Sequence, residues 1–292
     1  MKSLEESVVS VLGLGLLGGS LAWRLASKSA ARGVAGWSRN PATVEAAAAR
    51  GMITRACASA EECASLGDVI VLAVPVRSML ELSRSIVKSA RRDAAVFDLG
   101  STKREIGASL TTLWGDRYAG FHPMAGREKG GLENADPDLF VDAVCAVVPF
   151  PAVRPEFLTL ARGLAEALGG RPFLVDPEEH DAAAGCVSHL PVLLSAALSL
   201  LAGRELENNP AVAMLAAGGF RDCTRVAAGP AWLGADMVTG NYEQLRRLAE
   251  DFKKILGELL SASPAELESR LSEAGANREA LLQAKEERSR AP

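Results

Sequence analysis

The chain has 292 residues, of which 48% are hydrophobic and 23% charged, and its formal net charge is −4. This length suits two domains with sizeable cores, and the mild acidity, without a basic stripe, argues against a nucleic-acid partner. The five cysteines show neither paired nor metal-ligand spacing, so we expect free thiols in a reducing compartment and no metal site.

The first half of the chain has the pattern of an α/β domain. From Val8 to about Asp176, short β-rich runs alternate with helical stretches, which predicts a parallel sheet with crossover helices. A helix is predicted from about Gly18 to Ser29, and another begins at the capping pair Asn40-Pro41 and ends before Gly51. The predicted strands are Val8–Leu12, Gly33–Trp37, Asp68–Val74, Ala94–Leu99, Tyr118–Phe121, Ala143–Val148 and Pro172–Val175.

The second half has only helical signals. Asp176-Pro177-Glu178-Glu179 combines a capping residue, a first-turn proline and a glutamate at the third position, which predicts a helix start. We therefore predict an α/β dinucleotide-binding domain of the Rossmann type, residues 1–176, followed by an all-α dimerisation and substrate domain, residues 177–292. The predicted helices are His180 to about Ala202, Pro210–Ala217, Ala231 to about Ser261 and Pro264 to about Glu287.

Two long apolar stretches bear on location and assembly. Acidic Glu5 and Glu6 precede Val8–Trp23, so this stretch is interpreted as folded protein rather than a secretory signal. Cys186–Gly203 contains polar residues and is short for a membrane span, which favours a buried helix. We therefore expect a cytoplasmic protein without a membrane partner. Cys186–Gly203 and Ala211–Phe220 exceed what one helical layer normally buries, which predicts a homodimer.

A glycine pattern near the N-terminus predicts a dinucleotide site. Gly13-Leu14-Gly15-Leu16-Leu17-Gly18 follows an apolar strand and opens a helix, the context in which G-x-G-x-x-G binds dinucleotides. The first glycine permits a tight turn, the second admits the pyrophosphate, and the third lets helix and strand pack closely. The free amides at the helix start, around Leu16 and Leu17, would face the phosphates. Val74 and Pro75, at the end of another strand, complete the predicted cofactor site.

The residues after the second strand favour one cofactor. About twenty residues beyond Gly18, where NAD enzymes place an acid for the ribose, the chain has Trp37-Ser38-Arg39. Ser38 can hydrogen-bond a 2′-phosphate, and Arg39 can pair with it through a charge-assisted fork. NADP is therefore favoured, and NAD stays possible. The alternative is that Arg39 is a solvated surface charge.

Strand ends and two helical clusters supply the candidate reactive groups. Because ligands gather at the carboxyl ends of strands, we expect a site at Val74-Pro75, Leu99–Lys103 and Phe121-His122. His122 lies in a predicted turn-forming loop, which favours proton chemistry beside the cofactor; a histidine that only packs is the alternative. Ser188–Pro191 and Phe220–Arg225 place polar groups among apolar ones. They indicate either an anionic ligand or an internal ion pair of Asp222 with Arg225 or His189.

Six segments together resemble the prephenate and arogenate dehydrogenases of tyrosine biosynthesis. The resemblance runs in family order from about Val8 to Tyr242 and implies a dinucleotide domain, a helical dimerisation domain and oxidative decarboxylation of a cyclohexadienol. The segments are Gly13–Ser20, Asp98–Lys103, His122–Gly126, Glu179–Asp181, Ser188–Pro191 and Gly219–Arg225.

The resemblance also implies roles for individual residues. His122 would accept the proton of the substrate's ring C4 hydroxyl, assisted by Ser101, while hydride leaves C4 for the nicotinamide. His189 and Arg225 would hold the substrate's carboxylates, with Asp222 orienting them. Trp232 would lie near the substrate, and the reaction would need no metal.

Two other functions also fit part of this sequence pattern. β-Hydroxyacid dehydrogenases and imine reductases also join a nucleotide domain to helices, but the hydroxyacid enzymes use a helical-domain lysine, and this chain has none between Lys129 and Lys253. A dinucleotide-sensing dimer without catalysis is the third possibility. The substrate's side chain stays open, because Asp181 is either an acid facing the amino group of arogenate or a helix-surface charge.

Overall fold

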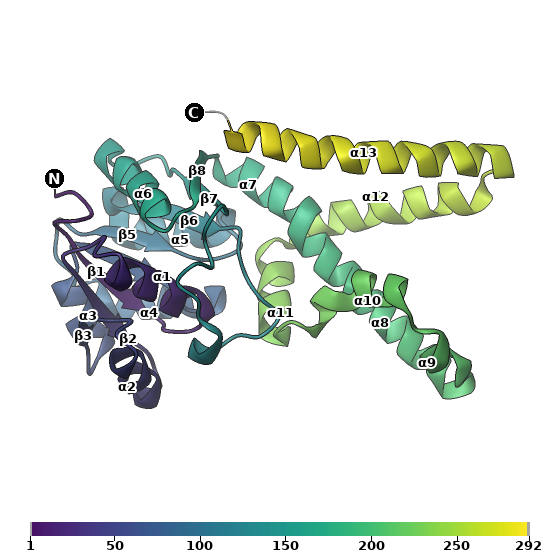
Figure 1. The fold of residues 1–292 in the computed structure, drawn as a ribbon. Helices are drawn as coiled ribbons and strands as arrows, with labels where there is room; N and C mark the ends of the chain where they lie inside the picture. Colours follow the sequence, from purple (N-terminus) through teal and green to yellow (C-terminus); the bar gives the residue numbers. More distant parts are fainter. Residues whose placement is uncertain (1, 291–292) are drawn as a thin grey trace. The chain divides into compact units, whose positions relative to one another are not determined.

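An eight-stranded sheet forms the centre of the N-terminal part of the chain. The computed structural model describes residues 2–290, and Figure 1 shows the course of the chain. The strand order is β3-β2-β1-β4-β5-β6-β7-β8. From β1 the chain adds β2 and β3 on one side, then crosses to the other side of β1 and continues with β4. This is the Rossmann arrangement, in which a ligand crevice is expected at the carboxyl ends of β1 and β4. The strands are β1 (Val8–Leu12), β2 (Gly33–Trp37), β3 (Arg55–Ala56), β4 (Val69–Leu72), β5 (Ala95–Asp98), β6 (Tyr118–Pro123), β7 (Val144–Val148) and β8 (Arg171–Leu174).

The sheet confirms the α/β prediction and corrects it in two places. Strands β6 and β7 pair antiparallel, whereas a parallel sheet was expected. The chain between them contains only a short 3₁₀ turn, Leu132–Asn134, instead of the crossover helix that a parallel return needs. Strand β3 was not predicted, because its two exposed residues are too few to show a period.

Each face of the sheet carries its own hydrophobic core. Along β4, Val69 and Val71 join one core while Ile70 and Leu72 join the other. This alternation is expected because successive side chains of a strand point to opposite faces. The first core is completed by α1 (Leu16–Ser27), α2 (Pro41–Ala49) and α6 (Pro155–Ala167), the second by α3 (Ala60–Leu66), α4 (Val76–Ile86) and α5 (Arg104–Trp114).

Predicted caps are found where the sequence placed them. The side chain of Asn40 accepts a hydrogen bond from the amide of Ala42, at the start of α2. The side chain of Asp176 accepts from the amide of Glu179 at 2.8 Å, at the start of α7 (Pro177–Ala184). Gly51 has φ of +67°, the left-handed conformation that glycine adopts readily after a helix end.

The C-terminal part is helical, as predicted. After α7, a π-helical turn, Gly185–His189, leads directly into the next helix. The predicted helix from Ala231 to Ser261 is two helices, because the chain leaves helical conformation at Asn241. The helices are α8 (Leu190–Asn208), α9 (Ala211–Leu215), α10 (Gly218–Thr224), α11 (Ala231–Gly240), α12 (Tyr242–Ser261) and α13 (Pro264–Arg290).

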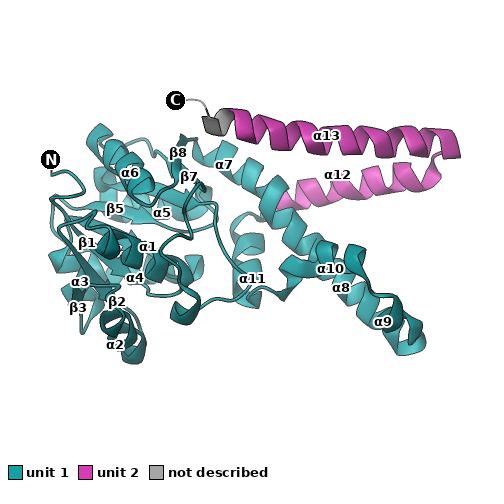
Figure 2. Cartoon of the chain, viewed as in Figure 1, with its two compact units in different colours: residues 1–242 teal, residues 243–292 magenta. Residues whose placement is uncertain are grey.

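The chain divides into two compact units, residues 1–242 and 243–292, which Figure 2 distinguishes by colour. The first unit contains the sheet together with α7 to α11, and the second contains most of α12 and all of α13. The domain boundary at residue 176 lies inside the first unit and stays a prediction.

The sequence predicted a buried helix too short for a membrane span at Cys186–Gly203, but most side chains of this stretch are exposed or half-buried. It belongs to a continuous helical segment, Pro177–Asn208, that is long and apolar enough to span a membrane by length and composition. Its 32 residues include the π-helical turn, and 28% of its most apolar window is buried. A single helix of this kind is weak support for a membrane span, because core and interface helices have the same composition.

Candidate active site

His122 lies near the carboxyl end of β6, between β5 and β7, and is buried. The sequence predicted it in a loop after the strand, but β6 extends to Pro123, and His122 pairs with Ala146 of β7. This correction follows from the antiparallel partner, whose ladder continues the strand by two residues. Its side chain is only 8% exposed. Burial, followed by the charges of Lys103, His180 and His189, lowers the pKa of His122 well below its ordinary value. His122 is therefore a neutral imidazole at pH 7.

A chain of hydrogen bonds links His122 to a buried carboxylate. The Nδ1 atom of His122 lies 2.9 Å from Nε2 of His180, and Nδ1 of His180 lies 2.8 Å from Oδ1 of Asp181. His180 and Asp181 belong to α7, so this chain connects the helical part to the sheet. No hydrogen bond from the described side chains, those of residues 2–287, engages Nε2 of His122. That atom is free to accept a proton.

Asp181 is neither a surface charge nor an acid free to meet a substrate. Its side chain is buried and accepts hydrogen bonds from the main-chain amides of Lys103 and Arg104, at 2.8 and 2.9 Å. Both earlier interpretations are therefore wrong, because this carboxylate caps the N-terminus of α5. Burial alone would raise the pKa of Asp181, but the hydrogen bonds from His180, Arg104 and Lys103 outweigh it and lower the pKa. Asp181 is ionised at pH 7.

His189 is the second buried histidine with a free ring nitrogen. It ends the π-helical turn and precedes α8, whose second residue, Pro191, cannot donate a helical hydrogen bond. The Nδ1 atom of His189 lies 3.2 Å from Nδ2, the side-chain amide nitrogen, of Asn241. Its Nε2 is buried and has no hydrogen-bond partner in the described part of the chain. Burial lowers the pKa of His189 to about 4, against the opposing effects of the Asp181 charge and of the nearby Ser101 main chain, so it is neutral at pH 7.

Ser101 follows β5, and its buried hydroxyl also has no partner within the described residues. Lys103 holds the loop that carries Ser101. Its buried Nζ donates to Asp98 Oδ1 at 2.7 Å and to the Gly100 carbonyl at 2.6 Å. The Tyr118 hydroxyl donates to the other Asp98 oxygen at 2.6 Å. From the helical side, a Cβ on Gly240 would lie 2.8 Å from the Thr102 hydroxyl. The loop is fixed on both sides.

The second helical cluster is more exposed than predicted. Arg225 forms an ion pair with Glu128, which lies in the loop after β6, and its side chain is 64% exposed. The alternative of an internal pair between Arg225 and Asp222 is wrong, since Asp222 is exposed and its carboxylate forms no ion pair with the side chains of residues 2–287. Trp232 is 40% exposed, and the guanidinium of Arg77 lies 6.0 Å from its ring centre.

The glycine loop has the shape that a dinucleotide requires. Gly13 has φ of +108°, and a Cβ there would lie 2.5 Å from the Ala73 carbonyl oxygen. A Cβ on Gly18 would lie 1.9 Å from the Gly13 carbonyl oxygen, so both positions need glycine. A Cβ on Gly15 would meet no described atom within 4 Å, which leaves the backbone open to a phosphate. Gly15 precedes α1, so the free amides of Leu16 and Leu17 fit a pyrophosphate here.

The neighbouring strand ends complete this cofactor region. Ala73, Val74 and Pro75 follow β4, beside the glycine loop, and are partly buried. Ser38 and Arg39 follow β2 on the other side of β1, where Ser38 is partly buried and Arg39 exposed. Arg39 forms no ion pair with any residue that the structure describes. Its guanidinium is available to an anion.

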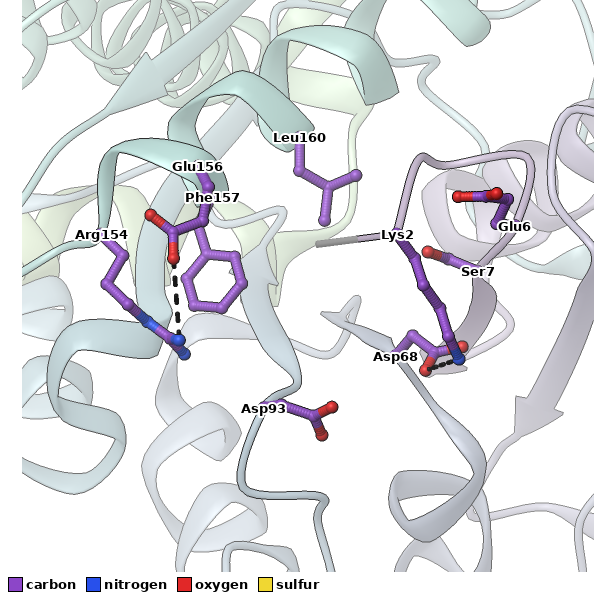
Figure 3. A pocket seen from close by; sticks show the side chains of 9 residues that line it. All are labelled: Lys2, Glu6, Ser7, Asp68, Asp93, Arg154, Glu156, Phe157 and Leu160. Carbon is purple, nitrogen blue, oxygen red and sulfur yellow. Dashed lines mark hydrogen bonds and ion pairs between the residues drawn. The ribbon is translucent and has the colours of Figure 1, made fainter.

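Among the described residues, neither a metal cluster nor the surface pocket lined by Lys2 and Asp68 belongs to this site. Among the described residues, no group of three or more His, Cys, Asp or Glu side chains could hold a metal ion. The pocket in Figure 3, of about 490 Å³, lies where β1, β4 and β5 begin, at the opposite edge of the sheet. There Lys2 pairs with Asp68 at 2.7 Å and Arg154 with Glu156 at 3.8 Å.

Comparison with known proteins assigns the family. The model of the prephenate dehydrogenase nucleotide-binding domain matches residues 21–174, and that of the prephenate dehydrogenase dimerization domain matches residues 176–273. The chain belongs to the prephenate dehydrogenase family. A prephenate dehydrogenase of Lactococcus lactis is 32% identical over 255 residues, which cover 86% of this chain and 70% of that protein.

Solved structures of family members have the same fold. Prephenate dehydrogenase from Aquifex aeolicus, in complex with hydroxyphenyl propionate and NAD+, has a TM-score of 0.88 and 29% identity, covering 96% of this chain and 100% of that one. Synechocystis arogenate dehydrogenase has a TM-score of 0.81 and 30% identity, covering 94% and 99%. This chain is therefore a dehydrogenase of the prephenate and arogenate type, with a nucleotide-binding domain of the Rossmann kind followed by a helical dimerisation domain.

In this member of the prephenate dehydrogenase family, the structure adds three residues that the sequence did not single out. His180 contacts His122, Asn241 contacts His189, and Lys103 supports the loop of Ser101. His180 and Lys103 stand inside motifs that carried the family resemblance, which was the available signal for them. Asn241 had no such signal beyond its position in a break between two helices.

Proposed function

We propose that this dehydrogenase oxidises ring C4 of prephenate or arogenate, with His122 as the base that accepts the proton of the C4 hydroxyl. One observation carries the assignment of the base. His122 is buried, its pKa is lowered so that it is neutral, and its Nε2 is free of hydrogen bonds from the described residues. A general base must be unprotonated and must have a free electron pair within reach of the proton that it accepts.

The chemistry follows from the cyclohexadienol itself. An oxidised nicotinamide bound at the glycine loop would supply the acceptor for the hydride that leaves C4. As the hydroxyl proton moves to Nε2 of His122, the electron pair of the O–H bond forms the C4 carbonyl. The bond from the ring to its carboxylate then breaks and carbon dioxide leaves. The electron pair of that bond enters the ring, which becomes aromatic, and the C4 oxygen takes up a proton to form the phenol. Ser101, with its unpartnered hydroxyl, is suited to hold the C4 oxygen during the transfer.

Two groups are suited to the substrate's carboxylates. The buried, unpartnered Nε2 of His189 is a donor that needs an acceptor, and a substrate carboxylate or carbonyl would supply one. Arg225 is exposed and paired with Glu128, so a second carboxylate would bind by replacing Glu128. We retain Asp222 and Trp232 as residues near the substrate, on the resemblance to the family.

We propose NADP as the preferred cofactor, with NAD as the other candidate. The support is chemical: the chain has Ser38 and an unpaired Arg39 after β2, where a ribose-binding acid would favour NAD. Val74 and Pro75 would contact the nicotinamide end from β4. The A. aeolicus enzyme was solved with NAD+, and this preference for NADP is a statement about the present chain alone.

We further propose a homodimer formed through the helical part, in a cytoplasmic protein. The supporting observation is the large apolar surface that the helices leave exposed, with Met214 at 86% and Leu215 at 79%. Exposed apolar side chains on or before α8 are Val187, Leu193, Leu198, Leu200, Leu201 and Leu206. Sedimentation as a dimer at micromolar concentration is expected; a fully active monomer would refute the dimer.

Steady-state kinetics with both substrates and both dinucleotides test the proposed function. The expected result is dinucleotide reduction that depends on prephenate or arogenate, with the larger kcat/KM for NADP. The ratio of the kcat/KM values for prephenate and arogenate then identifies which of the two is the preferred substrate. No reduction in any of the four combinations would reject the assignment.

A further inference from the structure

Two hydrogen-bonded chains lead from a single residue, Asp181, to the two histidines that have free ring nitrogens. One starts at its carboxylate and passes through His180 to His122. The other starts at its main-chain carbonyl and passes through Asn241 to His189. In each chain, the chemical nature of the first acceptor decides where the protons lie.

The carboxylate chain fixes the proton of His122. Asp181 is ionised and accepts two main-chain amides, so the His180 nitrogen that faces it must carry a hydrogen. When the His180 ring carries only this hydrogen, its Nε2 is an acceptor. Nδ1 of His122, 2.9 Å away, must donate to it. Nε2 of His122 is left unprotonated.

The carbonyl chain fixes the proton of His189 in the opposite sense. A main-chain carbonyl only accepts, so the Asn241 atom 2.7 Å from the Asp181 carbonyl is the amide nitrogen. That same nitrogen faces Nδ1 of His189 at 3.2 Å, which makes Nδ1 an acceptor. His189 is neutral, so its single hydrogen is on Nε2, the buried atom without a partner in the described chain.

We propose that Asp181 gives the two site histidines opposite tautomers, through its carboxylate for His122 and through its carbonyl for His189. His122 then presents a bare Nε2 that accepts a proton, and His189 presents an Nε2–H that donates a hydrogen bond. Asp181, His180 and Asn241 are positioning residues, since they act through the two histidines. This inference rests on the proposed function for what the two atoms bind, but not for where the hydrogens lie.

Opposite tautomers suit a substrate that has a hydroxyl at one end and carboxylates at the other. The hydroxyl needs an acceptor, and a carboxylate needs a donor. If both histidines carried hydrogen on Nε2, the base would have no free electron pair. If neither did, the unpartnered Nε2 of His189 would repel a carboxylate. The charged and titratable groups around His122, namely Lys103, His180 and His189, oppose its protonation, which keeps the free pair available.

The tautomers can be measured directly, because the whole protein has only three histidines. Untagged protein with ¹⁵N-labelled histidine, free of substrate, gives three side-chain patterns in a long-range ¹H–¹⁵N spectrum near pH 7. Protonated and bare ring nitrogens differ widely in ¹⁵N chemical shift. The expected pattern is Nδ1–H for His122 and His180 and Nε2–H for His189. The same tautomer on His122 and His189 would overturn the proposal.

Variants test each hydrogen-bonded chain separately and assign the ¹⁵N signals to the three histidines. His180→Leu removes the acceptor of His122, so Nε2 of His122 should become protonated in a large share of molecules, and kcat should fall roughly 100-fold with little change in KM. His180→Gln can donate to Asp181 and accept from His122, so it should restore the tautomer and most of kcat. His122 remaining wholly Nδ1–H in His180→Leu would overturn the carboxylate chain.

Asn241→Asp tests the carbonyl chain. An acceptor in place of the amide should draw a hydrogen onto Nδ1 of His189, leave the His122 tautomer unchanged, and raise KM about tenfold while kcat changes little. An unprotonated Nδ1 of His189 in this variant would overturn the carbonyl chain. Should neither variant fold, the wild-type spectrum alone decides. The expected tautomers in a protein that dehydrogenates neither substrate would reject the proposed function and leave this inference standing.

Discussion

The ammonium group of Lys103 lies 2.7 Å from the Asp98 carboxylate, and neither side chain is exposed to solvent. Tyr118 and the Gly100 amide also donate to Asp98, and the Gly100 carbonyl accepts from Lys103. The pair therefore closes the loop that carries Ser101 and holds it against the end of β5. A positive charge beneath the site also helps to keep His122 neutral.

Removal of this ammonium should destabilise the protein strongly. Lys103→Met leaves Asp98 buried and without its charge partner, which costs about 3 to 5 kcal/mol of unfolding free energy. Urea denaturation measures the change. Lys253→Met is the matched control, because Lys253 pairs with Glu250 at 2.8 Å on the surface and its loss should have no measurable effect. Equal stability of the two variants would show that the buried pair does not support the loop.

Arg39 should decide between the two dinucleotides. Arg39→Ala removes the expected partner of the 2′-phosphate, so the Kd of NADP should rise about 10- to 100-fold while that of NAD stays nearly constant. Calorimetric titration of both dinucleotides measures this. Arg32, an exposed arginine already paired with Asp68, is the control site, and Arg32→Ala should change neither Kd. Tighter binding of NAD than of NADP to the wild type would contradict the preference.

Arg225 and Glu128 should differ in their effects on substrate binding. Arg225→Gln removes a proposed carboxylate partner and should raise KM at least tenfold with little change in kcat. Glu128→Gln removes only the group that occupies Arg225 in the free protein, so KM should not rise. Arg225 is exposed, so the melting temperature should stay near wild type. A lowered melting temperature with an unchanged KM would show a structural ion pair instead.

The part of the site that the sequence predicted consists of positions that local patterns specify. The glycines of the first loop, the turn at Ser101 and the strand end at His122 follow from spacing and strand order. The link of His122 to His180 spans 58 residues, and no local pattern specifies such a contact. Asp181 was misread because sequence gives a residue's place on a helix but not the amide groups that meet it. The break at Asn241 was missed because the flanking residues have strong helical patterns.

Acid should destabilise the folded protein through its buried histidines. The pKa of His189 falls from about 6.5 to about 4 on folding, and that of His122 is also lowered, so the unfolded chain binds more protons below pH 6.5. The stability from these neutral rings is present above pH 6.5 and is lost as pH falls toward 4. For His189 alone, the loss between pH 7 and 5 is about 2 kcal/mol.

Urea unfolding at pH 7 and pH 5 measures this dependence. His189→Gln should reduce the loss, because glutamine does not titrate. The reduction should be visible as a shallower slope of unfolding free energy against pH. An equal loss in wild type and variant would place the pH dependence elsewhere in the chain.

The most direct test of the central claim is the turnover of His122→Asn. Carbon dioxide release and dinucleotide reduction are measured together with the preferred substrate, and dinucleotide Kd is measured separately. Wild type should release one carbon dioxide for each dinucleotide reduced. His122→Asn should bind the dinucleotide normally and lose roughly 100-fold or more in kcat, because it removes the proposed proton acceptor. A folded His122→Asn protein with an unchanged kcat would contradict the account.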